Sequence, residues 1–114
     1  MLTFANRLTS REDFARVTKS SIRTRTKSLS GYLTLEEKLT EPKIGFIVSR
    51  VVGGSVSRHR ISRKLRHVAR ESLHLLPKNS MVVVRINYKE CDIDRELPEL
   101  LSSLRERSST KVAR

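Results

Sequence analysis

Residues 58–76 are expected to form a helix that can bury only one of its sides. On a helical wheel at about 100° per residue, the apolar and small side chains fall within an arc of about 100°, namely Ile61, Leu65, Val68, Ala69, Ser72 and Leu76. Basic side chains occupy roughly the opposite 160°, namely Arg60, Arg63, Lys64, Arg66, His67 and Arg70. Such a helix must pack its apolar stripe against another layer and keep its cations at the surface, so the segment predicts a layered domain.

Strand patterns lie on both sides of this helix. Residues 29–35 and 44–48 alternate apolar side chains with polar or small ones, which predicts two strands. Residues 81–88, MVVVRINY, are rich in β-branched side chains and predict a third strand. Between the second strand and the basic helix, Gly53 and Gly54 permit a sharp turn.

Two further helices complete the expected order. Thr9 and Glu12 stand at the spacing of a capping box, which predicts a short helix over residues 10–19. Asp94 can cap a last helix that carries Leu97, Leu100, Leu101 and Leu104 at helical spacing. The resulting order is α-β-β-α-β-α, and the fold class that it predicts is α+β, a small single-domain α/β sandwich.

The length of 114 residues fits one domain with one core. Only five residues are aromatic, so that core must be mainly aliphatic. We expect a single domain over residues 1–114, with a frayed tail from about residue 108. No apolar run approaches the roughly 18 residues that span a bilayer, and the first residues lack the apolar block of a signal peptide, which predicts a cytoplasmic protein with no membrane partner.

Positive charge is the strongest compositional signal. The formal net charge is +12, and no Asp or Glu stands between Glu41 and Glu71 to pair with the cations of the basic helix. Arginine predominates there, and its forked guanidinium suits bidentate contact with phosphate. The interpretation is a helix that binds nucleic-acid phosphates; the plainer alternative is a merely solvated basic face. Its candidate residues are Arg58, His59, Arg60, Arg63, Lys64, Arg66 and Arg70.

Nothing in the chain predicts autonomous catalysis. The three histidines, His59, His67 and His74, are eight and seven residues apart, and we expect no carboxylate to orient them. Cys91 is the single cysteine, so it has no second thiolate for zinc and is expected to behave as a small hydrophobe. We therefore expect neither catalytic residues nor a metal site on the protein itself.

Residues 43–70, KIGFIVSRVVGGSVSRHRISRKLRHVAR, resemble the signature of the bacterial ribonuclease P protein component. In that family a strand leads through a Val-Gly turn into an Arg-Asn-Arg-x-Lys-Arg-x-x-Arg helix. Here the turn is Val52-Gly53 and the helix reads from Arg58 to Arg66. NRLTSREDFARV also resembles the family's amino-terminal helix opening. The chain departs from the family pattern at four positions, Thr18, Val51, His59 and Ser62.

The resemblance implies an accessory protein subunit of an endoribonuclease holoenzyme that removes the 5′ leader from precursor tRNA. In the family a large catalytic RNA performs the hydrolysis with bound Mg²⁺, the protein alone binds no cofactor, and the arginine helix lies against that RNA. The family fold contains a βαβ crossover of left-handed sense. No protein partner is inferred.

The resemblance also implies a second site, a cleft between the first helix and the sheet that holds the single-stranded leader. Phe14 and Tyr32 offer flat faces on which bases can stack, and Lys27 is expected nearby for the backbone, together with Arg16 and Lys19. For Phe14 the alternative is a core position in a short helix.

Two other classes of protein remain open at this point. A ribosomal or general structural RNA-binding protein would share the charge, the size and the arginine helix, but would lack the leader cleft. A helix-turn-helix DNA-binding protein would need a helix packed directly before the basic one, where this chain has a β-branched strand.

Overall fold

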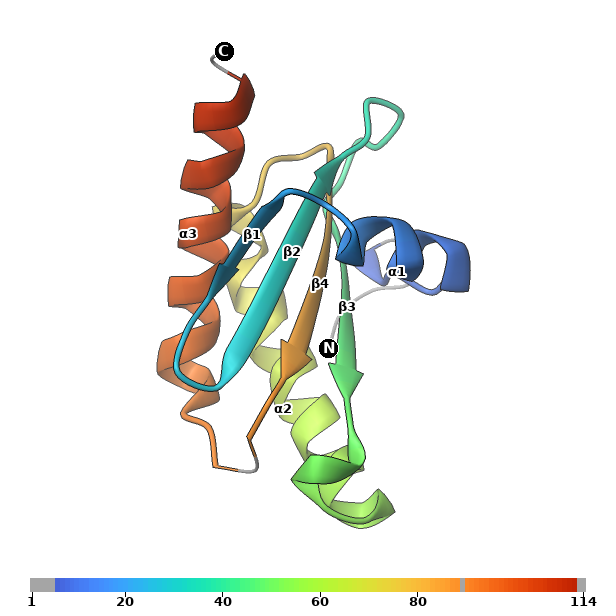
Figure 1. Cartoon of the computed structure of the whole chain (residues 1–114), viewed down its shortest axis with the longest axis vertical. Helices are drawn as coiled ribbons and strands as arrows, with labels where there is room; N and C mark the ends of the chain where they lie inside the picture. Colours follow the sequence, from blue (N-terminus) through green and yellow to red (C-terminus); the bar gives the residue numbers. More distant parts are fainter. Residues whose placement is uncertain (1–5, 89, 113–114) are drawn as a thin grey trace.

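The computed structural model describes residues 6–88 and 90–112. Within these described residues, three helices and four strands follow one another, with short 3₁₀ turns at Arg50–Val52 and Leu73–Leu75. The elements are α1 (Arg11–Thr18), β1 (Ile22–Arg25), β2 (Leu29–Leu35), β3 (Lys43–Val48), α2 (Ser55–Ser72), β4 (Ser80–Ile86) and α3 (Ile93–Val112). The strands form one sheet in the order β1-β2-β4-β3 (Figure 1).

The predicted fold class is confirmed, and the structure adds one strand to the predicted order. β1 was not expected, because its four residues, IRTR, give only a short pattern and its partner strand is not evident from the sequence. It pairs antiparallel with β2, and β2 pairs antiparallel with β4. β3 and β4 are parallel neighbours. Two parallel strands need a long connection, and α2 supplies it, so the expected βαβ crossover is present.

The main core lies between the sheet and the helices α2 and α3 (Figure 1). The apolar stripe predicted for the basic helix is buried there, because Leu65 and Ala69 have no exposed surface. α3 adds four leucines that are also fully buried, Leu97, Leu100, Leu101 and Leu104. Strands β2 and β4 meet them with Leu29, Leu33, Val82 and Val84. Complete burial of a leucine or valine side chain stabilises a fold by about 1.5–3 kcal/mol, so this cluster dominates the stability of the domain.

The opposite face of the sheet carries a smaller apolar cluster beneath α1. Its buried members are Leu8, Val17, Met81 and Val83. Met81 and Val83 belong to β4, whose alternate residues Val82 and Val84 face the main core, so this strand is buried on both faces. The second cluster was not anticipated, because the face containing Tyr32 was interpreted as polar.

Helix boundaries differ from the predictions in four places. The basic helix expected over residues 58–76 is α2, which runs from Ser55 to Ser72 and is followed by the 3₁₀ turn Leu73–Leu75. The N-cap of α1 is Ser10, whose hydroxyl accepts a hydrogen bond from the Asp13 N–H, and not Thr9. Asp94 lies in the first turn of α3 and does not cap it. α3 continues to Val112, into the segment expected to fray, while residues 113–114 lie outside the described part of the chain. None of the described helices is both long and apolar enough to cross a membrane.

Gly53 forms the turn into α2, as predicted. Its φ angle of 128° lies in a region that residues other than glycine rarely adopt. A Cβ atom there would also stand 3.0 Å from the Cβ of Ser57. Gly54, by contrast, has an ordinary φ of −75° and open space where a Cβ would lie. Only the first of the two glycines is therefore required by the backbone.

A buried carboxylate joins the β1–β2 turn to the start of α3. Glu96 is only 3% exposed, and it accepts hydrogen bonds from the Ser28 N–H at 2.8 Å and the Thr26 hydroxyl at 2.9 Å. The Asp92 N–H and the Cys91 thiol also donate hydrogen bonds to this carboxylate, at 3.3 and 3.5 Å. Burial by itself raises the pKa of Glu96, but these hydrogen bonds outweigh it and leave the pKa below its usual value.

Cys91 packs against the main core, as expected for a small hydrophobe, and its thiol also donates to Glu96 in this network. The thiol is half-buried, and burial together with the neighbouring Glu96 carboxylate raises its pKa to about 12. At neutral pH it is therefore a protonated donor and not a reactive thiolate.

The turn at Gly53 can be tested by comparing two alanine substitutions. We expect Gly53→Ala to destabilise the protein by about 1–3 kcal/mol, because the alanine must adopt a strained backbone conformation. Gly54→Ala is the matched control and is expected to leave stability unchanged or slightly raised. Urea unfolding of both variants measures the difference. Equal stabilities would show that the turn relaxes without cost.

The Glu96 network predicts a loss of stability in acid. A carboxylate with a lowered folded-state pKa stabilises the fold above its unfolded pKa, near 4.5, and this contribution disappears as the pH falls through the lower folded value. At pH 7 we expect Glu96→Gln to cost about 2 kcal/mol, since charge-assisted hydrogen bonds are lost, and to cost less near pH 3. Urea unfolding at both pH values tests this, with the exposed Glu99→Gln as control. A penalty that does not depend on pH would contradict the ionised network.

Candidate nucleic-acid interface

The outward face of α2 carries the exposed cations that the sequence predicted. Arg60, Arg63 and Arg70 are exposed, as is His59. All of these except Arg70 line a shallow depression of about 690 Å³, whose lining is Val56, His59, Arg60, Arg63, Lys64 and His67. Val56 is 72% exposed, unusual for an aliphatic side chain. We call this surface the outward face of α2.

Two of the predicted cations on α2 have acidic partners. The Lys64 Nζ atom lies 3.0 Å from an Asp94 carboxylate oxygen on α3. His67 Nε2 lies 3.5 Å from Glu71, one turn further along the same helix. The expectation that no carboxylate would stand near the histidines was therefore wrong for His67. Both pairs are largely exposed and weak, so they leave the outward face strongly positive.

A third group of α2 side chains faces the edge of the sheet. Arg58, Ser62 and Arg66 follow one another at four-residue spacing and are half-buried, unlike the exposed Arg60 and Arg63. They lie toward β3 and line two adjoining cavities with Phe46. The prediction had grouped Arg58 and Arg66 with the outward cations, and the structure separates them.

The other face of the sheet presents a second basic surface, which α1 covers only in part. Strand register places Arg23 beside Tyr32 and Arg25 beside Ser30, and Arg85 of β4 follows Ser30 in the same row. Residues directly opposite in a sheet share a face, so these side chains form one continuous surface. A depression of about 470 Å³ lies over it, lined by Arg23, Thr24, Arg25, Ser30, Tyr32 and Arg107. We call this surface the open sheet face.

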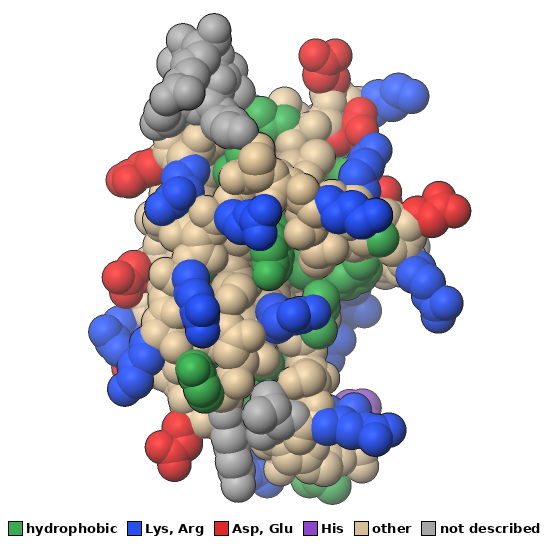
Figure 2. Space-filling model, viewed as in Figure 1, with side chains coloured by type: hydrophobic (Ala, Val, Ile, Leu, Met, Phe, Trp, Pro, Cys, Tyr) green, Lys and Arg blue, Asp and Glu red, His purple; other side chains and the backbone are tan. Residues whose placement is uncertain are grey.

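Figure 2 shows the side of the molecule that carries these strands. Lys and Arg side chains are spread over the middle of this side, while Asp and Glu side chains lie mostly toward its rim. A chain of phosphates laid across the strands would therefore meet cations along its path.

Phe14 lies on the same side of the sheet as Tyr32, but it is near β3, whereas Tyr32 belongs to β2. Its ring contacts Gly45 so closely that a Cβ there would overlap the ring, with the Cε1 atom at 2.8 Å. Gly45, Val83 and Tyr32 are neighbours across β3, β4 and β2, so the backbone of Tyr32 lies about 10 Å, two strand spacings, from the glycine that the Phe14 ring contacts. Both rings are half-buried against the small apolar cluster. Each ring can therefore receive a different base.

The cations expected beside these rings are not the ones that the structure brings there. Lys27 lies in the turn before β2, five residues along the strand from Tyr32, which corresponds to about 16 Å. Arg16 is paired with Glu36 at 3.3 Å and with Asp13 at 3.7 Å, so two carboxylates offset its charge. Arg23 and Arg25 take these places instead. Their signal was visible as cations alternating with threonines in residues 23–27, but it pointed to no partner strand.

Other predicted features carry little chemistry. The described residues contain no group of three or more His, Cys, Asp or Glu side chains close enough to hold a metal ion. Tyr88, expected in the core or loosely packed, is 52% exposed. The side chain of Val51 lies outside the part of the structure that is described. The outward face of α2 thus offers cations and imidazoles, and the open sheet face offers cations, hydroxyl groups and an aromatic ring, all of which suit the binding of nucleic acid.

Comparison with known sequences places the chain among described families. The family model "Ribonuclease P" matches residues 2–107. A ribonuclease P protein component from Streptomyces griseus is 40% identical over 93 residues, with 75% of this chain and 76% of the relative covered. The corresponding protein from Beutenbergia cavernae is 33% identical over an alignment of 119 positions that covers both chains completely.

Solved structures show the same fold. The ribonuclease P protein from Thermotoga maritima superimposes with a TM-score of 0.70 at 22% identity, covering 89% of this chain and 96% of the other. A ribonuclease P protein from Staphylococcus aureus gives a TM-score of 0.65 at 16% identity, covering 96% and 95%. At these identities the structural likeness supports the architecture, while the family assignment rests on the sequence matches.

Proposed function

The chain belongs to the family of ribonuclease P protein components, and we propose that its two basic surfaces bind two different RNAs within that endoribonuclease. The outward face of α2 binds the catalytic RNA. The open sheet face binds the single-stranded 5′ leader of precursor tRNA. The observation that carries this division is their placement, since α2 and the open sheet face lie on opposite sides of the sheet.

Exposure and charge support the first assignment. Arg60 and Arg63 are exposed on a rigid helix and have no acidic partner in the described part of the chain. When fixed guanidinium groups bind RNA phosphates, the counterions condensed on those phosphates are released. This release provides affinity without base recognition. A helix held by a fully buried stripe presents these groups at a constant spacing along the RNA backbone.

Geometry supports the second assignment. Tyr32 lies beside Arg23 on the open sheet face, and Phe14 lies at the far end of the same row. A ring next to a cation is the usual arrangement for single-stranded nucleic acid, because the ring stacks on a base and the cation contacts the adjoining phosphate. Stacking is tolerant of sequence, as binding to leaders of many precursor tRNAs requires.

We propose that the hydrolysis itself is carried out by the catalytic RNA with Mg²⁺ bound to it. The described residues of this chain offer no ligand cluster for a metal ion, and the acids with defined partners stabilise the fold. The protein contributes by holding the leader and by screening phosphates, so that both RNAs approach each other with less repulsion.

The α2 assignment predicts a change in the salt dependence of RNA binding. Replacing Arg60 and Arg63 together by alanine should weaken binding to ribonuclease P RNA and lower the slope of log Kd against log salt by roughly two, about one per lost phosphate contact. Filter-binding titrations over a series of KCl concentrations measure this slope. Stability should remain within about 0.5 kcal/mol of wild type, because both side chains are exposed.

The matched control removes the same charge elsewhere. Lys78→Ala combined with Arg105→Ala changes two exposed cations outside both surfaces. It should leave the salt slope nearly unchanged. If both double variants lower the slope equally, net charge and not the face of α2 determines the affinity.

The leader assignment predicts a selective effect at Tyr32. Tyr32→Ala should reduce the holoenzyme's preference for precursor over mature tRNA by about 1–3 kcal/mol, which is the contribution of one stacked base. We expect the lower part of that range, because Thr18 stands where the family carries a further ring. The measurement is a pair of dissociation constants, with leader-bearing and leaderless tRNA, at one salt concentration.

Tyr32→Phe is the control for this experiment, since it keeps the ring and should retain the preference. Affinity for ribonuclease P RNA should stay the same in both variants. An equal loss of affinity for precursor and mature tRNA in Tyr32→Ala would place the leader elsewhere on the protein.

A further inference from the structure

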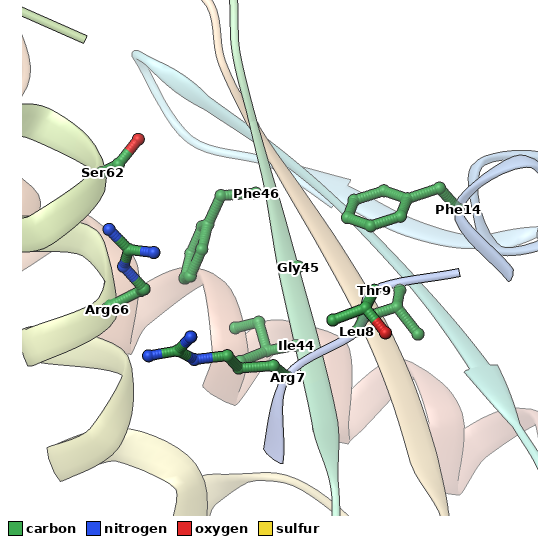
Figure 3. Close-up of a pocket in the computed structure, with 9 residues that line it drawn as sticks. All are labelled: Arg7, Leu8, Thr9, Phe14, Ile44, Gly45, Phe46, Ser62 and Arg66. Atoms are coloured by element: carbon green, nitrogen blue, oxygen red, sulfur yellow. The ribbon is translucent and has the colours of Figure 1, made fainter. Parts of the chain in front are cut away.

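The groove between β3 and α2 contains cations that neither surface described above uses. Arg7, Phe46, Ser62 and Arg66 line the α2 side of one cavity of about 260 Å³, whose lining also includes Leu8, Thr9, Phe14, Ile44 and Gly45. Phe46, Arg58 and Ser62 are among the residues that line an adjoining cavity of about 330 Å³. Figure 3 shows the guanidinium groups of Arg7 and Arg66 on the α2 side of β3, with the ring of Phe46 beside them. We call this pair of cavities the β3–α2 groove.

Three separate elements hold these side chains in place. Arg7 is fixed by a parallel bridge to Ile44, with the Leu8 N–H donating to the Ile44 carbonyl oxygen at 3.1 Å. Arg58 and Arg66 come from α2, two turns apart on its flank. Phe46 comes from β3 and packs partly against the main core. The groove is therefore built by the fold and does not depend on a single loop.

The arginines of the groove lack the partners that buried donors normally have. The Nε atoms of Arg7, Arg58 and Arg66 are shielded from solvent and make no hydrogen bond within the described residues. No Asp or Glu lines either cavity. Unsatisfied donors cost free energy, and three of them around one groove point to an acceptor that arrives from outside. An anion with several oxygens, which a small rotation of each guanidinium can reach, satisfies this need.

We propose that the β3–α2 groove binds one unpaired nucleotide of the RNA that lies on α2, with its phosphate between the arginines and its base against Phe46. This inference rests on the proposed function, because it takes α2 as an RNA-facing helix. Phe46 is half-buried beside the cations, so a base must leave its stack to reach the ring. The bases of an intact duplex cannot do so.

The groove is continuous with the outward face of α2, which favours RNA over a free nucleotide. His59 lines both the cavity beside Phe46 and the depression on the outward face. A strand that follows the exposed arginines can therefore pass over His59 and place its next nucleotide in the groove. Recognition of one unpaired nucleotide would give the helix a positional preference that phosphate contacts alone do not provide.

The test is a nucleotide-resolution footprint of ribonuclease P RNA without any tRNA. Acylation of 2′-hydroxyl groups should reveal one or two unpaired nucleotides that wild-type protein protects. Phe46→Leu, which removes the flat ring but keeps an apolar side chain, should expose those nucleotides and weaken binding about fivefold. Arg66→Lys keeps the positive charge but removes the guanidinium group that can donate two hydrogen bonds to one phosphate, and it should expose the same nucleotides. Arg60→Ala with Arg63→Ala should instead weaken the whole footprint evenly.

Several outcomes would overturn the proposal. One is that both groove variants fold, as judged by thermal unfolding, and still protect every nucleotide that wild-type protein protects. Arg66→Lys alone could expose the nucleotide, which would mean that the groove holds a phosphate and no base. An even loss across the footprint in both groove variants would assign these residues to general affinity.

A second measurement tests the groove without the large RNA. Adenosine 5′-monophosphate should shift the backbone amide resonances of Phe46 and Ser62 at lower concentration than inorganic phosphate does, and Phe46→Leu should abolish that difference. Shifts confined to the outward face of α2 would overturn the proposal. Because leader preference is measured separately at Tyr32, failure of the groove and failure of the proposed function are distinguishable.

Discussion

Burial of β4 on both faces is the constraint on which the rest of the structure depends. A strand buried on both faces needs a layer on each side, and the chain has enough apolar surface to supply only one complete layer. α2 and α3 form that layer. On the other side α1 and a few residues around Leu8 cover Met81 and Val83, and the remaining part of the sheet stays open. The incomplete second layer creates the open sheet face, while the complete first layer fixes the orientation of the arginines of α2.

Local patterns were sufficient to predict most elements but not their long-range partners. Alternation identified β2, β3 and β4, and the apolar stripe of α2 is buried as its spacing indicated. β1 was missed because its pairing depends on a turn held by Glu96, about 70 residues further along the chain. No local signal connects residues 22–26 with that carboxylate. The ion pair of Lys64 could not be predicted for the same reason, because its partner Asp94 belongs to another helix.

The candidate sites show where a helical wheel is insufficient. A helical wheel separates the apolar side from the basic side. It does not show that the cations next to the apolar stripe are half-buried, whereas those opposite the stripe are exposed. Arg58 and Arg66 lie at this boundary, and only the position of β3 shows that they face a groove together with Arg7. Tyr32 was placed on the correct face by strand alternation, whereas its neighbour Arg23 required the register of β1. Types of residue were thus predictable, and their groupings were not.

The position of α3 after all the other helices and strands of the domain has a consequence for synthesis on the ribosome. Four of the fully buried leucines lie in Leu97–Leu104, so the main core cannot close until α3 has been made. Until then, the apolar stripe of α2 and one face of β2 have nothing to cover them. The nascent chain also carries its strongly basic segment beside ribosomal RNA before it can fold. Closure of the main core is therefore a late step, which follows synthesis of α3 and does not proceed element by element during elongation.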